Sequence, residues 1–233
     1  MGWKLGAVGL CFAMLSWAVG ARGEETEPPD AAAIVTLVQT FYDQTATLQA
    51  SFEQTRYTRL YDRYDRASGN VVFKKPGKMR WDYAEPNAQV FVSDGKKLRI
   101  YQPPEQGEKR GQLIERALDQ DQLPSAFSFL TGEGDLEKDL EVRLLDHDDA
   151  KFQGGHVLQL IPRKPTPNYE QLVSSLRTPS TGAKRAAIGQ REHIIDAAGN
   201  RNRFDFSKLK FNREVSDKRF EYRPPKGTER VNP

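Results

Sequence analysis

The sequence predicts one mainly β domain, an antiparallel sheet with a few helices on one face, preceded by an export signal. Two observations indicate the domain: many short segments in which apolar and polar residues alternate between turn residues, and the absence of any internal repeat or second domain boundary. A third, an uncharged apolar run near the N-terminus, indicates export. The chain has 233 residues, 37% of them hydrophobic, which is enough for one sizeable core. An open sheet capped by helices and a half-open barrel both fit this pattern.

The N-terminus has the layout of a secretory signal peptide. Lys4 precedes residues 5–21, which contain no charged side chain, and the polar residues 22–25 follow. The run is at the short limit for spanning a hydrocarbon core of ~30 Å, so we expect it to be cleaved rather than retained as an anchor. Small residues favour cleavage after Ala21, with a cut after Gly23 as the second choice.

We expect residues 24–30 to form a short disordered lead and residues 31–233 to form the single mature domain. Cys11, the one cysteine of the chain, lies inside the expected signal. Leu10 stands directly before it, where an acylated lipoprotein signal needs a smaller residue, so we expect no N-terminal acylation. The mature domain then has no disulfide and no thiol chemistry.

The charges are balanced and scattered. There are 35 Lys and Arg residues against 32 Asp and Glu residues, a net charge of +3. A nucleic-acid interface requires basic residues clustered on one face, and we expect no nucleic-acid partner.

The sequence offers no constellation of catalytic residues. The three histidines, His147, His156 and His193, have no metal-ligand spacing, and the aspartates beside His147 are typical of a polar turn. There is no nucleophile elbow and no glycine-rich phosphate loop. We therefore expect no catalytic residue, no metal and no cofactor, and we favour a binding protein over an enzyme.

The expected elements follow from residue periodicity. Asp30 is a good N-cap for a helix that extends to about Thr47. Residues 67–70 indicate a turn, and Asp94-Gly95 indicates a hairpin. Residues 113–130 have mixed helical spacing with Pro124 at a helix start, and residues 177–187 indicate a loop. We expect strands at residues 48–57, 71–75, 78–83, 89–93, 97–101, 140–145, 156–161, 169–176, 190–196, 203–211 and 219–223.

The strands carry large apolar side chains that could form a binding pocket. Met79, Trp81 and Tyr83 alternate with charged residues, so they share one face of a strand. On one concave sheet face such side chains would line an apolar pocket, although an ordinary core is the alternative. The side chains of this kind on the expected strands are Phe73, Met79, Trp81, Tyr83, Val90, Val92, Leu98, Ile100 and Tyr101.

Several motifs occur together in a characteristic order. Residues 69–83 contain Lys-Pro-Gly-Lys-Met-Arg-Trp, and residues 92–95 read Val-Ser-Asp-Gly. Leu-Gln-Ala-Ser-Phe-Glu-Gln precedes them at residues 48–54, and further matching pieces follow at residues 124–132 and 196–228. With these motifs the chain resembles the periplasmic outer-membrane lipoprotein carriers, the LolA family, over about residues 31–232.

The resemblance implies a fold and a transport cycle. The fold would be a curved, incomplete antiparallel β-barrel with helices forming a lid over a hydrophobic cavity. A soluble, monomeric periplasmic chaperone of this kind takes lipid-modified proteins released from the inner membrane by an ABC transporter. It shields their acyl chains and delivers them to the outer membrane, where an acceptor could receive them. The candidate acyl-chain cavity comprises Phe52, Phe73, Met79, Trp81, Tyr83, Val90, Val92, Leu98, Ile100, Phe127 and Leu130.

The resemblance also suggests a latch for the lid. Lys75 stands where several family members have an arginine that ties the lid shut, and Arg80 is a second candidate for this role. Lysine lacks the planar donor fork of arginine. Two alternative functions reuse the fold: a lipid-sensing envelope regulator and a membrane-anchored lipoprotein acceptor.

Overall fold

The structure of the protein is a computed structural model, which describes residues 30–85, 88–117, 135–145, 152, 155–167, 169–177 and 188–231. The expected signal peptide, the lead before Asp30, the helix at Pro124 and nearly all of the expected loop at residues 177–187 lie outside the described residues. Among the described residues, no helix combines the length and apolar character needed to span a bilayer.

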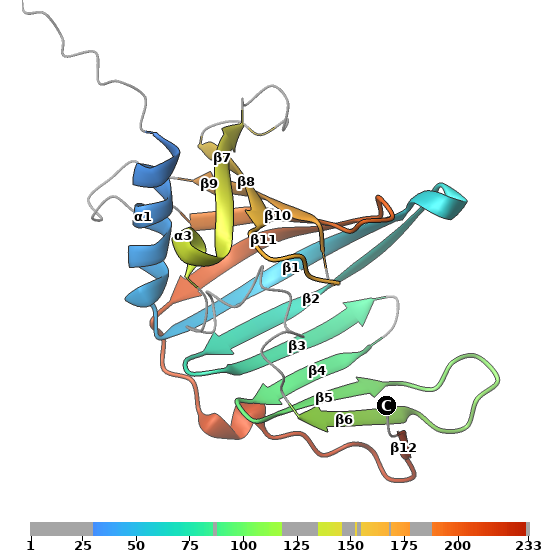
Figure 1. Ribbon diagram of the computed structural model, residues 1–233. Helices are drawn as coiled ribbons and strands as arrows, with labels where there is room; N and C mark the ends of the chain where they lie inside the picture. The colour runs from blue at the N-terminus through green and yellow to red at the C-terminus, as the bar shows by residue number, and fades with distance from the viewer. Residues whose placement is uncertain are drawn as a thin grey trace, which may run out of the picture.

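Twelve strands form one sheet in the order β12-β6-β5-β4-β3-β2-β1-β11-β10-β9-β8-β7. The pairs are antiparallel except β12 with β6, which is parallel, and the two edge strands of this order do not pair with each other. In Figure 1, α1 and α3 lie together at one end of the sheet and the β1–β2 hairpin projects at the other. The strands are β1 (Thr47–Thr58), β2 (Arg63–Lys74), β3 (Lys78–Glu85), β4 (Val90–Asp94), β5 (Lys97–Gln102), β6 (Gln112–Ala117), β7 (Leu140–Leu145), β8 (His156–Pro162), β9 (Gln171–Arg177), β10 (Ile188–Ile195), β11 (Arg201–Phe211) and β12 (Glu229–Val231).

The first helix, α1 (Ala31–Asp43), begins where the sequence predicts. The carboxylate of Asp30 accepts a hydrogen bond of 2.7 Å from the backbone N–H of Ala33, which confirms it as the N-cap. The helix ends four residues before the predicted Thr47. The hydroxyl of Thr45 donates to the carbonyl oxygen of Phe41 (2.7 Å), and the chain then enters β1. The other helical elements among the described residues are short: the 3₁₀ turns η1 (Arg59–Tyr61) and η3 (Asp217–Phe220), and α3 (Leu136–Asp139).

The predicted turn at residues 67–70 is wrong, because β2 continues straight through it. The chain instead reverses at the 3₁₀ turn η1 (Arg59–Tyr61), followed by Asp62 at φ 46°. The glycine at position 69 is needed because neighbouring atoms lie close to its Cα atom, and not because the chain turns there. A Cβ atom there would lie 2.2 Å from the carbonyl oxygen of Asp82 and 2.8 Å from the ring of Phe52.

Two further predictions are wrong. The segment that begins at Leu113 starts as strand β6, in which Ile114 pairs with Ile100 of β5. Residues 219–223 form no strand. The first two of them are the end of η3, and Phe220 is buried against Val72 and Val92. The edge strand β12 has three residues, too few to show a periodicity. The predicted strand at residues 71–75 is only the end of β2, which begins eight residues earlier at Arg63, and the other predicted strands are confirmed within a few residues.

The sheet has an inner and an outer face, each with its own core. The inner face carries Phe52, Phe73 and Trp81 and packs against the apolar side of α1. The outer face carries Val72 and Val92, which are covered by the C-terminal segment around η3. The side chains that α1 buries against the inner face are Ile34, Val35, Val38 and Tyr42.

Candidate binding site

The centre of the inner face is a cluster of aromatic rings around Phe52. The ring of Phe52 meets the rings of Trp81 and Tyr83 edge to face, with centroids 5.1 Å and 4.9 Å away. Phe204 lies 6.0 Å from Phe52 on the other side, and Phe73 lies 5.7 Å from Trp81. Because β3, β2, β1 and β11 are neighbours in the sheet, these rings form one continuous apolar surface.

Seven of the predicted cavity residues share this face. Phe52, Phe73, Met79, Trp81 and Leu98 are buried in the inner core, and Tyr83 and Ile100 are half-buried against it. Phe127 and Leu130 lie outside the described residues. The prediction omitted Phe91, Phe204 and Phe206, which belong to the same core. The alternating pattern that identified Trp81 also occurs at Phe204 and Phe206.

Val90 and Val92 lie on the outer face, so the prediction that they share a face with Trp81 is wrong. Arg80 pairs with Val92 and Trp81 pairs with Phe91, which places Phe91, not Val92, beside the tryptophan. Val92 is fully buried against the C-terminal segment. Tyr101 also lies on this face, with its ring 5.8 Å from that of Tyr222.

Lys75 contacts the helix that covers the inner face. Its Nζ atom donates a hydrogen bond of 2.5 Å to the carbonyl oxygen of Tyr42, near the C-terminal end of α1. Burial lowers the pKa of Lys75, and the nearby Asp43 opposes that shift. Asn212 holds the same end of the helix: it accepts from the N–H of Ala46 (2.7 Å) and donates to the carbonyl oxygen of Gln44 (3.3 Å).

Arg80, the second latch candidate, lies on the outer face. Its guanidinium forms an ion pair with Asp82 (2.8 Å) and donates to the carbonyl oxygen of Arg219 (3.1 Å). It also lies over the ring of Tyr222, 5.9 Å from the centroid. These contacts attach the C-terminal segment to the sheet. None of them is with α1, so the structure does not support a latch role for Arg80.

One carboxyl group is buried in the inner core beneath α1. Glu192 of β10 is 5% exposed, and the hydroxyl of Ser174 donates to its Oε1 atom (2.7 Å). Burial raises the pKa of Glu192 to about 8, although the bond from Ser174 acts to lower it. Glu192 is therefore mostly neutral at pH 7. Burial and the proximity of Glu192 also raise the pKa of Tyr42, whose hydroxyl oxygen accepts a bond from the N–H of Gly189 (3.3 Å).

A small hollow lies at this point beneath α1. Its volume is about 10 Å³, about the space of one water-sized sphere. At this place the helix and the sheet are in close contact, and a larger ligand could enter only if they separated. The hollow is lined by Tyr42, Leu48, Phe73, Gly189, Glu192, Phe206 and Leu209.

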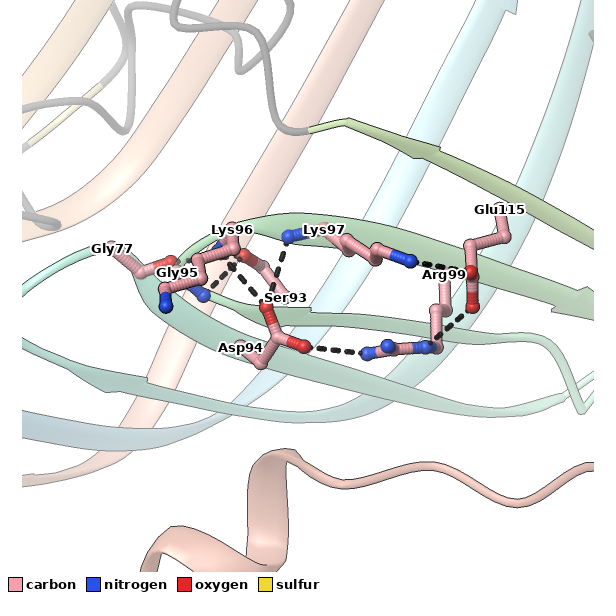
Figure 2. A network of polar contacts seen from close by, with 8 residues as sticks. All are labelled: Gly77, Ser93, Asp94, Gly95, Lys96, Lys97, Arg99 and Glu115. Carbon is pink, nitrogen blue, oxygen red and sulfur yellow. Dashed lines mark hydrogen bonds and ion pairs between the residues drawn. The ribbon is translucent and has the colours of Figure 1, made fainter.

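The Ser93-Asp94-Gly95 motif builds the predicted hairpin turn between β4 and β5 (Figure 2). The buried hydroxyl of Ser93 donates to the carbonyl oxygen of Gly77 (3.0 Å) and accepts from the N–H of Gly95 (3.1 Å). Asp94 accepts from two backbone N–H groups of the turn and from Arg99 (2.8 Å). Burial acts to raise the pKa of Asp94, but these bonds lower it to about 2. The motif is structural.

Sequence comparison identifies the family. The family model described as "Outer membrane lipoprotein carrier protein LolA" matches residues 43–223, most of the chain. The chain belongs to the LolA family. LolA-family carriers are non-enzymatic transport proteins, which confirms the expectation of lipoprotein transport without catalysis.

Relatives are similar to this chain over most of its length. An outer-membrane lipoprotein carrier protein of Chromobacterium violaceum is 29% identical over 95% of this chain and 97% of its own length. Another of Methylibium petroleiphilum is 30% identical, covering 81% of this chain and 84% of its own. A third, of Nitrosomonas europaea, is 27% identical, covering 86% and 90%.

Proposed function

We propose that this LolA-family protein carries lipoproteins across the periplasm by holding their acyl chains between α1 and the inner face of the sheet. One observation carries the proposal: a continuous surface of aromatic and aliphatic side chains on the inner face, with the apolar side of α1 packed against one end of it (Figure 1). A helix can move as a unit from such a surface without breaking the strand pairs.

The energetics of acyl chains require a carrier of this kind. Each methylene group removed from water contributes about 0.8 kcal/mol, so a lipid-modified protein cannot cross an aqueous compartment unaided. The carrier must also release its cargo, which favours an interior that opens readily. Where Tyr42 of α1 lies over Leu48, Phe73 and Glu192, the hollow measures only about 10 Å³, so an acyl chain could enter at this place only if α1 moved away.

Within the described residues, several polar contacts besides those of Asn212 and Gly189 attach α1 to its neighbours. Lys75 holds the carbonyl oxygen of Tyr42, and Gln39 accepts a bond of 3.0 Å from the N–H of Leu136 in α3. The hydroxyl of Thr36 donates to Glu137 (2.9 Å). Contacts of this kind contribute about 1–3 kcal/mol each, the larger values applying to bonds with a charged group, so cargo can displace them. In this proposal Lys75 is the latch and α1 is part of the lid.

The expected export signal places the carrier in the periplasm. There it would receive lipoproteins from a lipoprotein-releasing ABC transporter of the inner membrane and pass them to the outer membrane, with or without an acceptor protein. The family match favours a carrier over an envelope regulator.

The direct test is a detergent-free complex. The purified protein, mixed with a lipoprotein during dilution out of detergent, should keep that lipoprotein in solution and co-elute with it on gel filtration. Trp81→Glu and Ile100→Glu should lose the complex, because each places a charge on the inner face. Leu144→Glu, at a position 42% exposed on β7, should retain it.

Circular dichroism separates binding from folding. Trp81 is 7% exposed, so its substitution could unfold the domain, whereas Ile100 is only half-buried. If folded protein fails to hold the lipoprotein, or if folded Ile100→Glu holds it as well as the wild type, the proposal is wrong.

A further inference from the structure

The tip of the β1–β2 hairpin exposes large apolar side chains. In η1, Leu60 is 81% exposed and Tyr61 is 71% exposed, and Tyr64, at the start of β2, is 65% exposed. The hairpin projects beyond its neighbours at the end of the sheet opposite α1 (Figure 1). Exposed apolar side chains gathered at one projecting tip are characteristic of a contact site.

The tip has a defined conformation. The ring of Tyr57 lies 4.7 Å from that of Tyr64, and its hydroxyl donates to Asp62 (3.0 Å). The N–H of Arg59 donates to the side chain of Asn200 (2.9 Å), which ties the hairpin to the β10–β11 turn. These contacts lie beneath the tip and leave Leu60 and Tyr61 facing solvent. The apolar group is thus presented by a braced structure.

Positive charge is concentrated around these apolar side chains. Four exposed arginines occur within residues 55–66, and the adjoining start of β11 contributes two more, so six arginines stand against four aspartates, Asp62, Asp65, Asp196 and Asp205, the last ion-paired with Arg203 (2.7 Å). Six arginines minus four aspartates leave a charge of +2 at this end of the sheet, which is most of the net charge of +3 of the whole chain. The arginines are Arg56, Arg59, Arg63, Arg66, Arg201 and Arg203.

A polar hollow lies along the same hairpin, on its inner side. It has a volume of about 310 Å³, and its lining includes Arg56, Arg63, Arg66 and Tyr83. Asp65 is 3.5 Å from Arg56 and 3.0 Å from Arg63, whereas Arg66 has no ion-pair partner within the part of the chain that the structure describes. This hollow offers guanidinium groups to a phosphate close to the exposed apolar side chains.

We propose that the β1–β2 hairpin tip docks onto the surface of a bilayer that contains anionic phospholipids. Leu60 and Tyr61 enter the interfacial region, and the surrounding arginines contact lipid phosphates. Interfacial binding combines apolar burial with attraction between basic residues and anionic lipids, and tyrosine is enriched at this depth.

An acidic protein is a less suitable partner for the hairpin tip than a bilayer is. A stable protein interface buries roughly 800 Å² on each partner, typically over 20–30 residues. The apolar part of this tip consists of three side chains on a narrow projection, a shape that suits shallow insertion. Docking would bring the end of the inner face close to the membrane. This inference adds a membrane contact to the carrier function and does not depend on cargo binding.

Vesicle co-sedimentation tests the proposal. The processed protein, its N-terminus verified by mass spectrometry, should sediment with vesicles of phosphatidylethanolamine and phosphatidylglycerol, and much less with phosphatidylcholine or at high salt. Leu60→Ser/Tyr61→Ser should lower the partition coefficient about tenfold or more. Arg59→Gln/Arg63→Gln should lower it about fivefold per arginine.

Matched substitutions on β7 provide the controls. Leu144→Ser and Arg143→Gln change an exposed leucine and an exposed arginine outside the hairpin, and they should leave partitioning unchanged. All variants have the same N-terminus as the wild type, so any contribution of the N-terminus to vesicle binding is the same in every comparison. If the protein does not bind anionic vesicles, or if the tip variants partition like the wild type, the proposal is overturned. Because no lipoprotein is present, this result is independent of the carrier test.

Discussion

Glu192 is an acid placed in an apolar interior, and its titration is linked to the stability of the fold. Burial raises its pKa to about 8 in the folded state, from an ordinary value of 4.5. The unfolded chain therefore releases this proton at lower pH than the folded chain does. The stability that the protonated carboxyl supports is fully present below about pH 4.5 and is lost as the pH rises through 8.

Glu192→Gln should remove this pH dependence. The amide keeps the shape of the neutral acid but cannot ionise, so the variant should gain stability relative to the wild type between about pH 4.5 and 8. At about 1.4 kcal/mol per pKa unit, the gain above pH 8 is on the order of 5 kcal/mol. Urea unfolding at a series of pH values measures it. Glu170→Gln, at an exposed carboxyl, is the control, and identical pH profiles of Glu192→Gln and the wild type would contradict the assignment.

At the level of single residues, the sequence predicted much of the site. Alternation within residues 78–83 identified Met79, Trp81 and Tyr83, and the Lys-Pro motif pointed to Lys75. Val90 and Val92 were misplaced because the register between β3 and β4, which pairs Trp81 with Phe91, is set by tertiary pairing rather than by local pattern. Glu192 was not identified, because nothing in the local sequence shows that a helix 150 residues away covers it.

Among the elements, the β4–β5 turn shows how the family motif supports the sheet. Ser93 joins this turn to the turn before β3 through the carbonyl oxygen of Gly77. Arg99 and Lys97 of β5 both reach Glu115 of β6, so the network extends over three strands (Figure 2). The motif therefore fixes the register of strands that form the inner face.

Ser93→Ala should destabilise the domain by about 1–3 kcal/mol, because it leaves the buried carbonyl oxygen of Gly77 without this donor. Chemical denaturation measures the change. Ser207→Ala, at an exposed serine of β11, should have little effect. Equal stabilities of the two variants would show that the Ser93 network does not support the fold.

Lys75 is one of the residues that attach α1 to the sheet, whereas the adjacent Lys74 contacts the C-terminal segment on the outer face. Lys75 binds the carbonyl oxygen of Tyr42, and Lys74 binds Asp217 (2.6 Å) and the carbonyl oxygen of Val215 (2.8 Å). The two adjacent lysines therefore offer a matched pair of substitutions, one affecting the contact with α1 and the other the contact with the C-terminal segment.

Lys75→Met should loosen α1. Amide hydrogen exchange in the last turn of the helix should become faster, because one attachment of its C-terminal end is lost, while exchange around η3 should not change. Lys74→Met should produce the reverse pattern. Faster exchange at η3 but not at α1 in Lys75→Met would rule out Lys75 as a latch.

The sequence predicted most elements but not all of their limits. Strands with two sides in different environments, such as β3, show clear alternation, and the structure confirms them. The hairpin reversal was misplaced to residues 67–70, because Gly69 looks like a turn residue. Its actual role, the close approach of Asp82 and Phe52, depends on strands that meet only in the folded chain.

At the scale of the whole molecule, a single open sheet carries a separate hydrophobic cluster on each of its two faces. The outer face is sealed by the C-terminal segment, with Phe220 and Val215 over Val72 and Val92. The inner face packs at one end against the apolar side of α1 (Figure 1). The composition and periodicity predicted a mainly β fold, but the order of the strands could not be predicted from them. It depends on the pairing of β1 with β11, which are about 150 residues apart in the chain.

The central claim is that acyl chains bind on the inner face beneath α1, and site-specific photocrosslinking tests it most directly. A photoreactive phenylalanine analogue would be placed at Ile100 on the inner face or at Val90 on the outer face, and each protein would be loaded with a lipoprotein carrying labelled acyl chains. We predict crosslinks to the acyl chains from position 100 and none from position 90. Crosslinks from position 90 without any from position 100, while both proteins are folded and loaded, would contradict the account.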